Sequence, residues 1–134
     1  MRRIDLITQA CDPKTLTVGQ LMQDALFTCT ARTDALTIGR LMTKQNFGGL
    51  PVVAEDGSLV GLVTEYDLLQ AMIEGRDLRK VFASEIMTTQ PLAARENMTL
   101  EEVANLFQDR YVTRLPVVRG KQLVGIVARR DLLH

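Results

Sequence analysis

The chain contains one unit of sequence written twice, and this repeat limits the folds available to it. Residues 50–53, Leu-Pro-Val-Val, return at residues 115–118, which is 65 positions later. A glycine and an aspartate follow each copy, and Asp67 returns as Asp131, 64 positions later. One residue has therefore been lost from the second copy, in the turn after Val118. Two copies of one unit usually pack about a pseudo-two-fold axis, so we expect two related clefts.

The composition argues against several classes of protein. A chain of 134 residues with 46% hydrophobic residues matches one ordinary globular domain. Because the formal net charge is zero, neither nucleic acid nor an anionic membrane is expected as a partner. No apolar run approaches the roughly 20 residues needed to span a bilayer, and polar residues interrupt the start of the chain where a signal peptide needs an apolar stretch. We therefore expect a cytoplasmic protein.

Cysteine and histidine are too few and too far apart for a metal site or a catalytic pair. Cys11 and Cys29 have no Cys-x-x-Cys spacing, and the one histidine, His134, is the last residue. A zinc site or a disulfide framework is therefore not expected, and no nucleophile with a nearby base is visible. The sequence predicts a protein that is not an enzyme, requires no cofactor and resides in a reducing compartment.

Each copy is predicted to fold as strand, helix, strand, strand and helix, which is a mixed α+β (α/β) architecture. In the first copy, residues 27–30 are expected to form the short strand, and Thr33 or Asp34 to cap the helix that follows. Thr99 and Glu102 predict a capping box for the matching helix of the second copy. The apolar faces of these two helices are Ala35, Ile38, Leu41 and Met42, and Leu100, Val103, Leu106 and Phe107.

The two Leu-Pro-Val-Val segments predict hairpins. In the first copy, a turn at residues 55–57 is expected to join residues 52–53 to a strand at 59–63, and the second copy repeats this pattern. Pro51 and Pro116 are expected at the first residue of their strands, where a missing N–H group does least harm to the hydrogen-bond ladder.

Two heptads with the pattern Gly-x-x-x-x-x-Asp, at 61–67 and 125–131, carry the residues best suited to binding a ligand. A carboxylate in the first turn of a helix, such as that of Asp67, can accept two hydrogen bonds from the vicinal hydroxyls of a ribose. The amide groups at the start of that helix suit a phosphate, and glycine permits close backbone approach. The alternative is structural, because Thr64 and Asp67 also form a capping box and the glycine can simply ease the end of a strand.

The second heptad differs from the first. Ala128 stands where the first copy has threonine, so it cannot cap through a hydroxyl, yet Asp131 is kept. Capping alone therefore explains less of the second copy, although an acid in a first helical turn is also favoured by the helix dipole. Arg129 and Arg130 are either solvated surface charges or ligands for an anion.

This duplicated pattern resembles a pair of CBS domains, the regulatory modules named after cystathionine β-synthase. The resemblance rests on Leu-Met and Ile-Met before the first strands, on both Leu-Pro-Val-Val segments and on both heptads. It implies an extension at residues 1–16, a first repeat at 17–73, a linker at 74–81 and a second repeat at 82–134. The second repeat stops before the counterpart of Ile73, so its last helix is expected to be truncated.

The resemblance also implies a β-α-β-β-α fold for each repeat, packing of the two repeats about a pseudo-two-fold axis, and a homodimer. Two ligand clefts between the repeats are implied. Asp67 and Thr64 would act with base-framing residues of the second repeat, and Asp131 with those of the first. Arg130 stands where relatives often place a basic residue for phosphate, and Ala128 removes a hydroxyl that reaches the ligand in relatives.

The residues that the resemblance assigns to the ligand fall into two groups. Those expected to hold ribose and phosphate are Thr64, Asp67, Arg114, Arg129, Arg130 and Asp131. Those expected to frame the base are Thr28, Phe47, Gly48, Ala94, Val112 and Thr113. Structural alternatives exist for several of them: Phe47 as a core residue, Gly48 as part of a turn, and Arg114 as an exposed edge charge.

Two functions from different classes follow. The first is a regulatory module that senses AMP, ADP, ATP or S-adenosylmethionine in its clefts and signals to an effector protein or domain that the sequence does not identify. The ligand must then prefer one of two arrangements, since equal affinity for both shifts nothing. The alternative is a ligand-free structural or protein-interaction module whose main activity is dimerisation.

Overall fold

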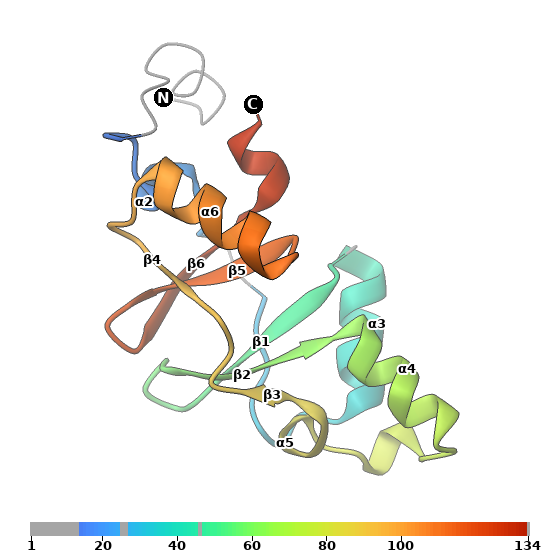
Figure 1. Ribbon diagram of the computed structural model, residues 1–134. Helices are drawn as coiled ribbons and strands as arrows, with labels where there is room; N and C mark the ends of the chain where they lie inside the picture. The colour runs from blue at the N-terminus through green and yellow to red at the C-terminus, as the bar shows by residue number, and fades with distance from the viewer. Residues whose placement is uncertain (1–13, 25–26, 46, 134) are drawn as a thin grey trace. The chain divides into compact units, whose positions relative to one another are not determined.

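The computed structural model describes residues 14–24, 27–45 and 47–133, which form two compact units (Figure 1). The central unit is Phe27–Pro91, and the terminal unit combines Met1–Leu26 with Leu92–His134. Each unit has its own three-stranded sheet and its own helices, which confirms the predicted mixed α and β architecture. In the N-terminal extension, the apolar residues Ile4, Leu6 and Ile7 predict a short amphipathic helix, and these residues lie outside the described ranges.

The central unit contains the hairpin of the first sequence copy and the two longer helices of that copy, at 35–45 and 65–73. Its elements are, in chain order, α3 (Ala35–Gln45), β1 (Gly49–Val53), β2 (Leu59–Thr64), α4 (Glu65–Ile73), η1 (Leu78–Lys80), α5 (Ala83–Ile86) and β3 (Thr88–Thr89). The strands lie in the order β1-β2-β3, and both pairs are antiparallel. Ile38 of α3, Leu68 of α4 and Leu50 of β1 belong to one buried cluster, so the helices and the sheet share a core.

The first helix of this unit follows the predicted pattern. Its apolar face is buried at Ala35, Ile38 and Met42 and half-buried at Leu41. The N-terminal cap is Asp34, whose carboxylate accepts a hydrogen bond from the N–H of Thr37 at 2.9 Å. The hydroxyl of Thr33 instead accepts from the N–H of Thr30 at 3.1 Å, outside the helix. Of the two candidate caps, Asp34 is therefore the one that holds the helix.

Both hairpins form as predicted, but the predicted place of the prolines is wrong. Pro51 is the third residue of β1, and Pro116 is the third residue of β5 (Arg114–Arg119). The carbonyl of Pro51 accepts the N–H of Cys29 at 2.9 Å, and the N–H that proline lacks would face this same neighbour. The strand predicted at 27–30 is accordingly reduced to a single bridge between Cys29 and Val52.

The terminal unit contains the hairpin and the longest helix of the second sequence copy, together with a short helix of the first copy. Its elements are α2 (Val18–Leu21), β4 (Ala94–Arg95), α6 (Leu100–Arg110), β5, β6 (Gln122–Ala128) and the 3-10 helix η2 (Arg129–Leu132). The strand order is β4-β5-β6, with β4 parallel to β5 and β6 antiparallel to it. The predicted capping box of α6 is confirmed, because the N–H of Glu102 donates to the Thr99 hydroxyl at 3.2 Å and the N–H of Thr99 donates to the Glu102 carboxylate at 3.0 Å.

The stretch that begins each sequence copy packs with the other copy. Gln23, near the start of the first copy, exchanges two backbone hydrogen bonds of 2.8 and 2.9 Å with Ile126 of β6. Strand β3, near the start of the second copy, pairs with β2 in the central unit. The sequence copies and the compact units are thus two different divisions of the chain. Among the described residues, none of the helices combines the length and the apolar character needed to cross a membrane.

Candidate functional site

The first heptad ends at a fixed carboxylate at the start of α4. The N–H of Thr64 donates to Oδ2 of Asp67 at 2.8 Å, and the Thr64 hydroxyl donates to the same oxygen at 3.0 Å. The N–H of Asp67 donates back to that hydroxyl at 3.3 Å, so the predicted capping box is present. The other oxygen, Oδ1, accepts no hydrogen bond from the part of the chain that the structure describes. Capping therefore occupies only Oδ2 of this half-buried carboxylate, and Oδ1 can accept a hydrogen bond from a ligand.

The second heptad repeats the backbone geometry in a more enclosed setting. The N–H of Ala128 donates to Oδ2 of Asp131 at 2.7 Å, which matches the bond made by Thr64. Asp131 is only 1% exposed, whereas Asp67 is half-buried. A ligand can reach Asp131 only if the groups that cover it move, so the two aspartates are unequal in access as well as in their neighbours.

In each unit, the loop before the Leu-Pro segment forms a backbone hydrogen bond with the heptad of the same unit. In the central unit, the N–H of Glu65 donates to the carbonyl of Gly48 at 3.1 Å. In the terminal unit, the N–H of Arg129 donates to the carbonyl of Thr113 at 2.8 Å. Two predicted base-framing residues therefore lie beside the start of α4 or η2 through equivalent backbone bonds. The assignment of each loop to the aspartate of the other repeat stays a prediction.

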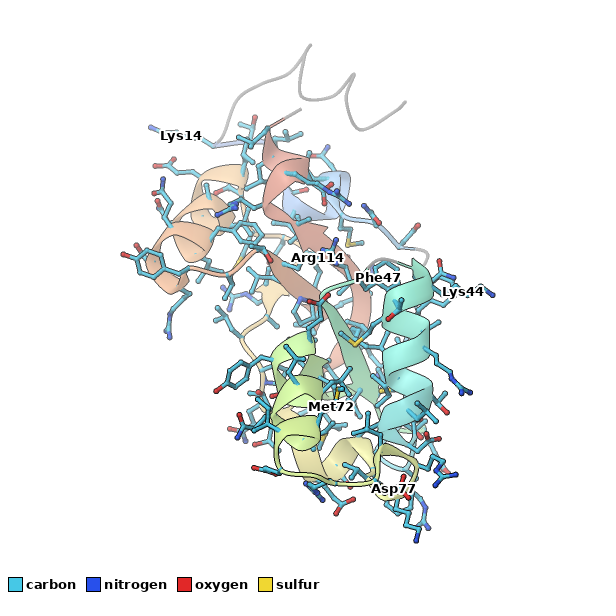
Figure 2. The ribbon with its side chains drawn as sticks, turned by 90° about the vertical axis from the view of Figure 1, so that its right-hand side faces the viewer. Lys14, Lys44, Phe47, Met72, Asp77 and Arg114 are labelled. Carbon is cyan, nitrogen blue, oxygen red and sulfur yellow. The ribbon has the colours of Figure 1, made fainter. Side chains whose placement is uncertain are left out.

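The remaining candidates of the central unit are aromatic and hydroxyl residues. The ring of Phe47, which is labelled in Figure 2, lies 5.7 Å from the ring of Phe27, centroid to centroid, with an angle of 50° between the planes. Phe47 is half-buried, and Phe27 and Thr28 are exposed. An aromatic pair of this geometry stabilises the loop in front of β1, which is the structural interpretation of Phe47, while its half-exposed ring leaves room for a ligand contact.

The remaining candidates of the terminal unit differ in access. Ala94 is fully buried in β4, so only its backbone is a plausible ligand contact. Val112 is half-buried and packs against the core of this unit. Arg114, at the start of β5, is half-buried and pairs in register with Ala128 (Figure 2). Arg129 and Arg130 are exposed. The assignment of these residues to a ligand stays a prediction, and the sequence pattern could not reveal their different degrees of burial.

The heptad glycines have a role that the sequence alone did not reveal. A Cβ atom on Gly61 would lie 2.9 Å from Cγ of Met87 and closer still to its sulfur. A Cβ atom on Gly125 would meet Met22 in the same way. The glycines therefore make room for methionine side chains rather than for a ligand. Each methionine comes from the stretch that begins the other sequence copy. The signal was present in the sequence, because Met22 and Met87 recur with the same period as the rest of the repeat.

The described residues offer little for covalent chemistry. Cys29 is a free thiol in the core of the central unit, and burial raises its pKa to about 11, so the thiol stays protonated at neutral pH. In the described ranges, no three His, Cys, Asp or Glu side chains are grouped so that they could hold a metal ion. What the arrangement offers is hydrogen-bond acceptance and charge at the two heptads.

Comparison with known proteins agrees with this geometry. The family model described as "CBS domain" matches residues 18–74 and 83–134. The CBS domain-containing protein YhcV of Bacillus subtilis (strain 168) is 41% identical over 93 residues, which cover 69% of this chain and 65% of YhcV. The chain thus spans slightly less than two thirds of this relative.

Two solved structures are similar over most of their length. CBSX2, a CBS-pair protein from Arabidopsis thaliana, in complex with AMP is 31% identical with a TM-score of 0.77, over 88% of this chain and 93% of CBSX2. The CBS domain pair of protein MJ0100, in complex with 5′-methylthioadenosine and S-adenosyl-L-methionine, is 27% identical with a TM-score of 0.78, over 89% and 94%. With both copies matched by the family model, this chain belongs to the CBS domain family, as a tandem CBS pair.

Proposed function

We propose that the chain is a regulatory module that binds an adenosine compound, with Asp67 as the residue that holds the ribose. The observation that carries this proposal is that the two oxygens of the Asp67 carboxylate differ in their hydrogen-bond partners. Oδ2 of Asp67 is fixed by the backbone of Thr64 at 2.8 Å, while Oδ1 has no partner among the described residues. A positioned, half-buried acceptor of this kind suits a vicinal diol, and hydrogen bonds to a charged group contribute about 1.5–3 kcal/mol each.

Similar proteins support the class of ligand. CBSX2 has been solved with AMP, and the MJ0100 pair with 5′-methylthioadenosine and S-adenosyl-L-methionine. All three ligands share adenosine and differ at the 5′ position. The base-framing roles of Ala94, Val112 and Thr113 toward Asp67, and of Thr28, Phe47 and Gly48 toward Asp131, are part of this proposal, as is phosphate binding by Arg114, Arg129 and Arg130. So is a cytoplasmic, non-catalytic role.

The outer face of α4 favours a second activity, association with a second copy of the chain. Leu69, Met72 and Ile73 are 55%, 58% and 79% exposed, and their spacing places them along one face of this helix. A groove of about 700 Å³ lies between α3 and α4, with Leu69 and Met72 in its lining. Met72 is labelled on α4 in Figure 2. Large apolar side chains gathered on one exposed face are typical of a protein interface. We propose a homodimer through this face.

The two activities share one helix. Asp67 lies in the first turn of α4, and the exposed apolar residues follow within two turns. A ligand that orders the start of α4 can therefore change how its outer face associates, provided that it binds the two arrangements with different affinity. The dimerisation module without a ligand remains the alternative, and it predicts an intact dimer that does not respond to adenosine compounds.

Calorimetric titration with AMP, ATP, 5′-methylthioadenosine and S-adenosylmethionine tests the proposal. Asp67→Ala should weaken binding at least tenfold, since it removes two charge-assisted hydrogen bonds. Glu102→Ala is a matched control, because it also removes the acid of a capping box but in α6. No heat from any of these compounds at millimolar concentration would rule out the ligand-sensing function and leave the dimerisation module.

Light scattering separates the second activity from the first. Leu69→Glu with Met72→Glu should convert the dimer to a monomer while ligand binding at Asp67 is retained. Leu133→Glu, at an exposed apolar residue of the terminal unit, is the control and should leave the mass unchanged. A wild-type monomer at micromolar concentration contradicts this interface.

A further inference from the structure

The groove between α3 and α4 contains a glycine that the packing of the central unit does not require. Gly39 lies in the lining of the groove and in the interior of α3. Among the described residues, a Cβ atom at this position would meet Cδ1 of Leu68 at 3.6 Å, which is an ordinary van der Waals distance. Alanine would therefore fit, and it is far more favourable than glycine inside a helix. The missing side chain leaves space in the groove that a group from outside the unit can fill.

The two walls of this groove carry opposite charge. On α3, the exposed Arg40 and Lys44 are in the lining, and this helix contains no acidic residue. On α4, the exposed Glu65 is in the lining, and this helix contains no basic residue. Figure 2 labels Lys44 on α3 and Met72 on α4. In the described part of the chain, none of the three charged side chains has an ion-pair partner, so all three are available to another molecule.

We propose that α4 of a second copy of the chain lies in this groove, so that the two copies associate through their central units. The inference rests on the homodimer proposed above and adds the arrangement of its two copies. In a two-fold dimer every contact occurs twice, so the α3 wall of each copy faces α4 of the other. Arg40 and Lys44 then lie opposite Glu65 of the second copy, and the apolar face of each α4 covers Gly39 of the other.

The apolar face of α4 favours this arrangement over contact with the terminal unit of the second copy. Leu69, Met72 and Ile73 need an apolar surface to cover them, and the groove supplies one. In the described part of the terminal unit, the large apolar side chains that are exposed are Tyr111 and Leu133, at the ends of α6 and η2. A surface that combines an apolar row, a groove and both signs of charge complements a copy of itself.

Reversal of the charges tests whether the two walls face each other. Arg40→Glu with Lys44→Glu makes all the charged residues of the groove acidic, and Glu65→Lys makes them all basic. Each variant alone should weaken the dimer at least roughly tenfold, because like charges then face each other across the interface. An equimolar mixture of the two should form a mixed dimer, since each wall again faces the opposite charge. Sedimentation velocity measures the association, and native mass spectrometry identifies the mixed dimer.

Substitutions of Gly39 test the space in the groove, because their effects on folding and on association have opposite signs. Gly39→Leu should weaken the dimer at least roughly tenfold by filling the groove, whereas Gln45→Leu, on α3 but outside the lining, should not. Gly39→Ala should raise the folding equilibrium constant of the monomer about twofold to fivefold. Urea unfolding in the Leu69→Glu and Met72→Glu background measures this constant without association. A loss of stability would show that the unit itself needs the glycine and would overturn this step.

Failure of this arrangement is distinct from failure of the proposed homodimer. If the wild-type protein dimerises and both charge variants dimerise equally well, the arrangement is refuted and the homodimer stands. Glu101→Lys with Asp109→Lys reverses two exposed acids of α6 and should leave the dimer intact; loss of the dimer in this control would instead place α3 against the terminal unit of the second copy. A wild-type monomer at micromolar concentration refutes the homodimer and the arrangement together. Melting curves verify the folding of each charge variant, which we expect to be retained because the reversed side chains are exposed.

Discussion

A single methyl group at Gly61 should disrupt the contact between β2 and the segment that the second copy contributes to the central unit. The added Cβ atom of Gly61→Ala would lie 2.9 Å from Cγ of Met87, closer to its sulfur, and 3.1 Å from the carbonyl oxygen of Thr88. Thr88 belongs to β3, which pairs with β2. Both a side chain and a backbone strand must therefore move to admit the methyl group.

The expected cost follows from two opposing terms. Overpacking a tight interior site costs about 1–3 kcal/mol. Replacing glycine by alanine stabilises the folded state by about 0.4–1 kcal/mol, because the unfolded chain has less conformational freedom. We therefore expect Gly61→Ala to lower the free energy of unfolding by about 1–2 kcal/mol and the melting temperature by roughly 4–8 °C for a chain of this size.

Urea unfolding of a double-mutant cycle measures the contact. Gly61→Ala and Met87→Ala should each destabilise, and the double variant should be less destabilised than their sum by about 1 kcal/mol, since the shorter side chain leaves space for the methyl group. Gly48→Ala is the control: its Cβ would meet no atom within 4 Å, so stability should change by less than about 0.5 kcal/mol. A neutral Gly61→Ala, or strict additivity with Met87→Ala, refutes the reasoning.

Three further predictions concern other parts of the fold. Hydrogen bonds from Thr99 lower the pKa of the Glu102 carboxyl from its usual 4.5, so the ionised group stabilises the fold above that pH and this contribution is lost as the pH falls through the lowered pKa. The free energy of unfolding of Glu102→Gln should therefore fall less steeply with decreasing pH than that of the wild type. Identical pH dependence of the two proteins would contradict this. Tyr111 ends α6 in the left-handed conformation at φ 54° and is 92% exposed, so Tyr111→Gly should raise the free energy of unfolding by about 0.5–1 kcal/mol; a loss of stability would show that the ring packs. The buried thiol of Cys29, with its pKa of about 11, should react slowly with a thiol reagent at pH 8 in a Cys11→Ser background and rapidly once urea unfolds the chain.

The parts of the fold that were predictable depend on residues close together in sequence. The capping boxes at Thr64 and Thr99, the buried faces of α3 and α6 and the two hairpins all follow from spacings of two to four residues or from a short turn. The sequence also identified the heptads that carry Asp67 and Asp131. The place of Pro51 was mispredicted because its tolerance depends on Cys29, more than 20 positions away.

The sequence by itself determined the duplication, the type of most elements and the position of both aspartates at the start of a helix, since these features depend on local periodicity and local hydrogen bonds. Only the tertiary structure decided which segments complete each sheet, why Gly61 and Gly125 are glycines and how accessible each aspartate is. Those properties arise from packing between residues far apart in the chain. Two heptads of nearly the same sequence pattern can therefore leave Asp67 half-open and Asp131 enclosed.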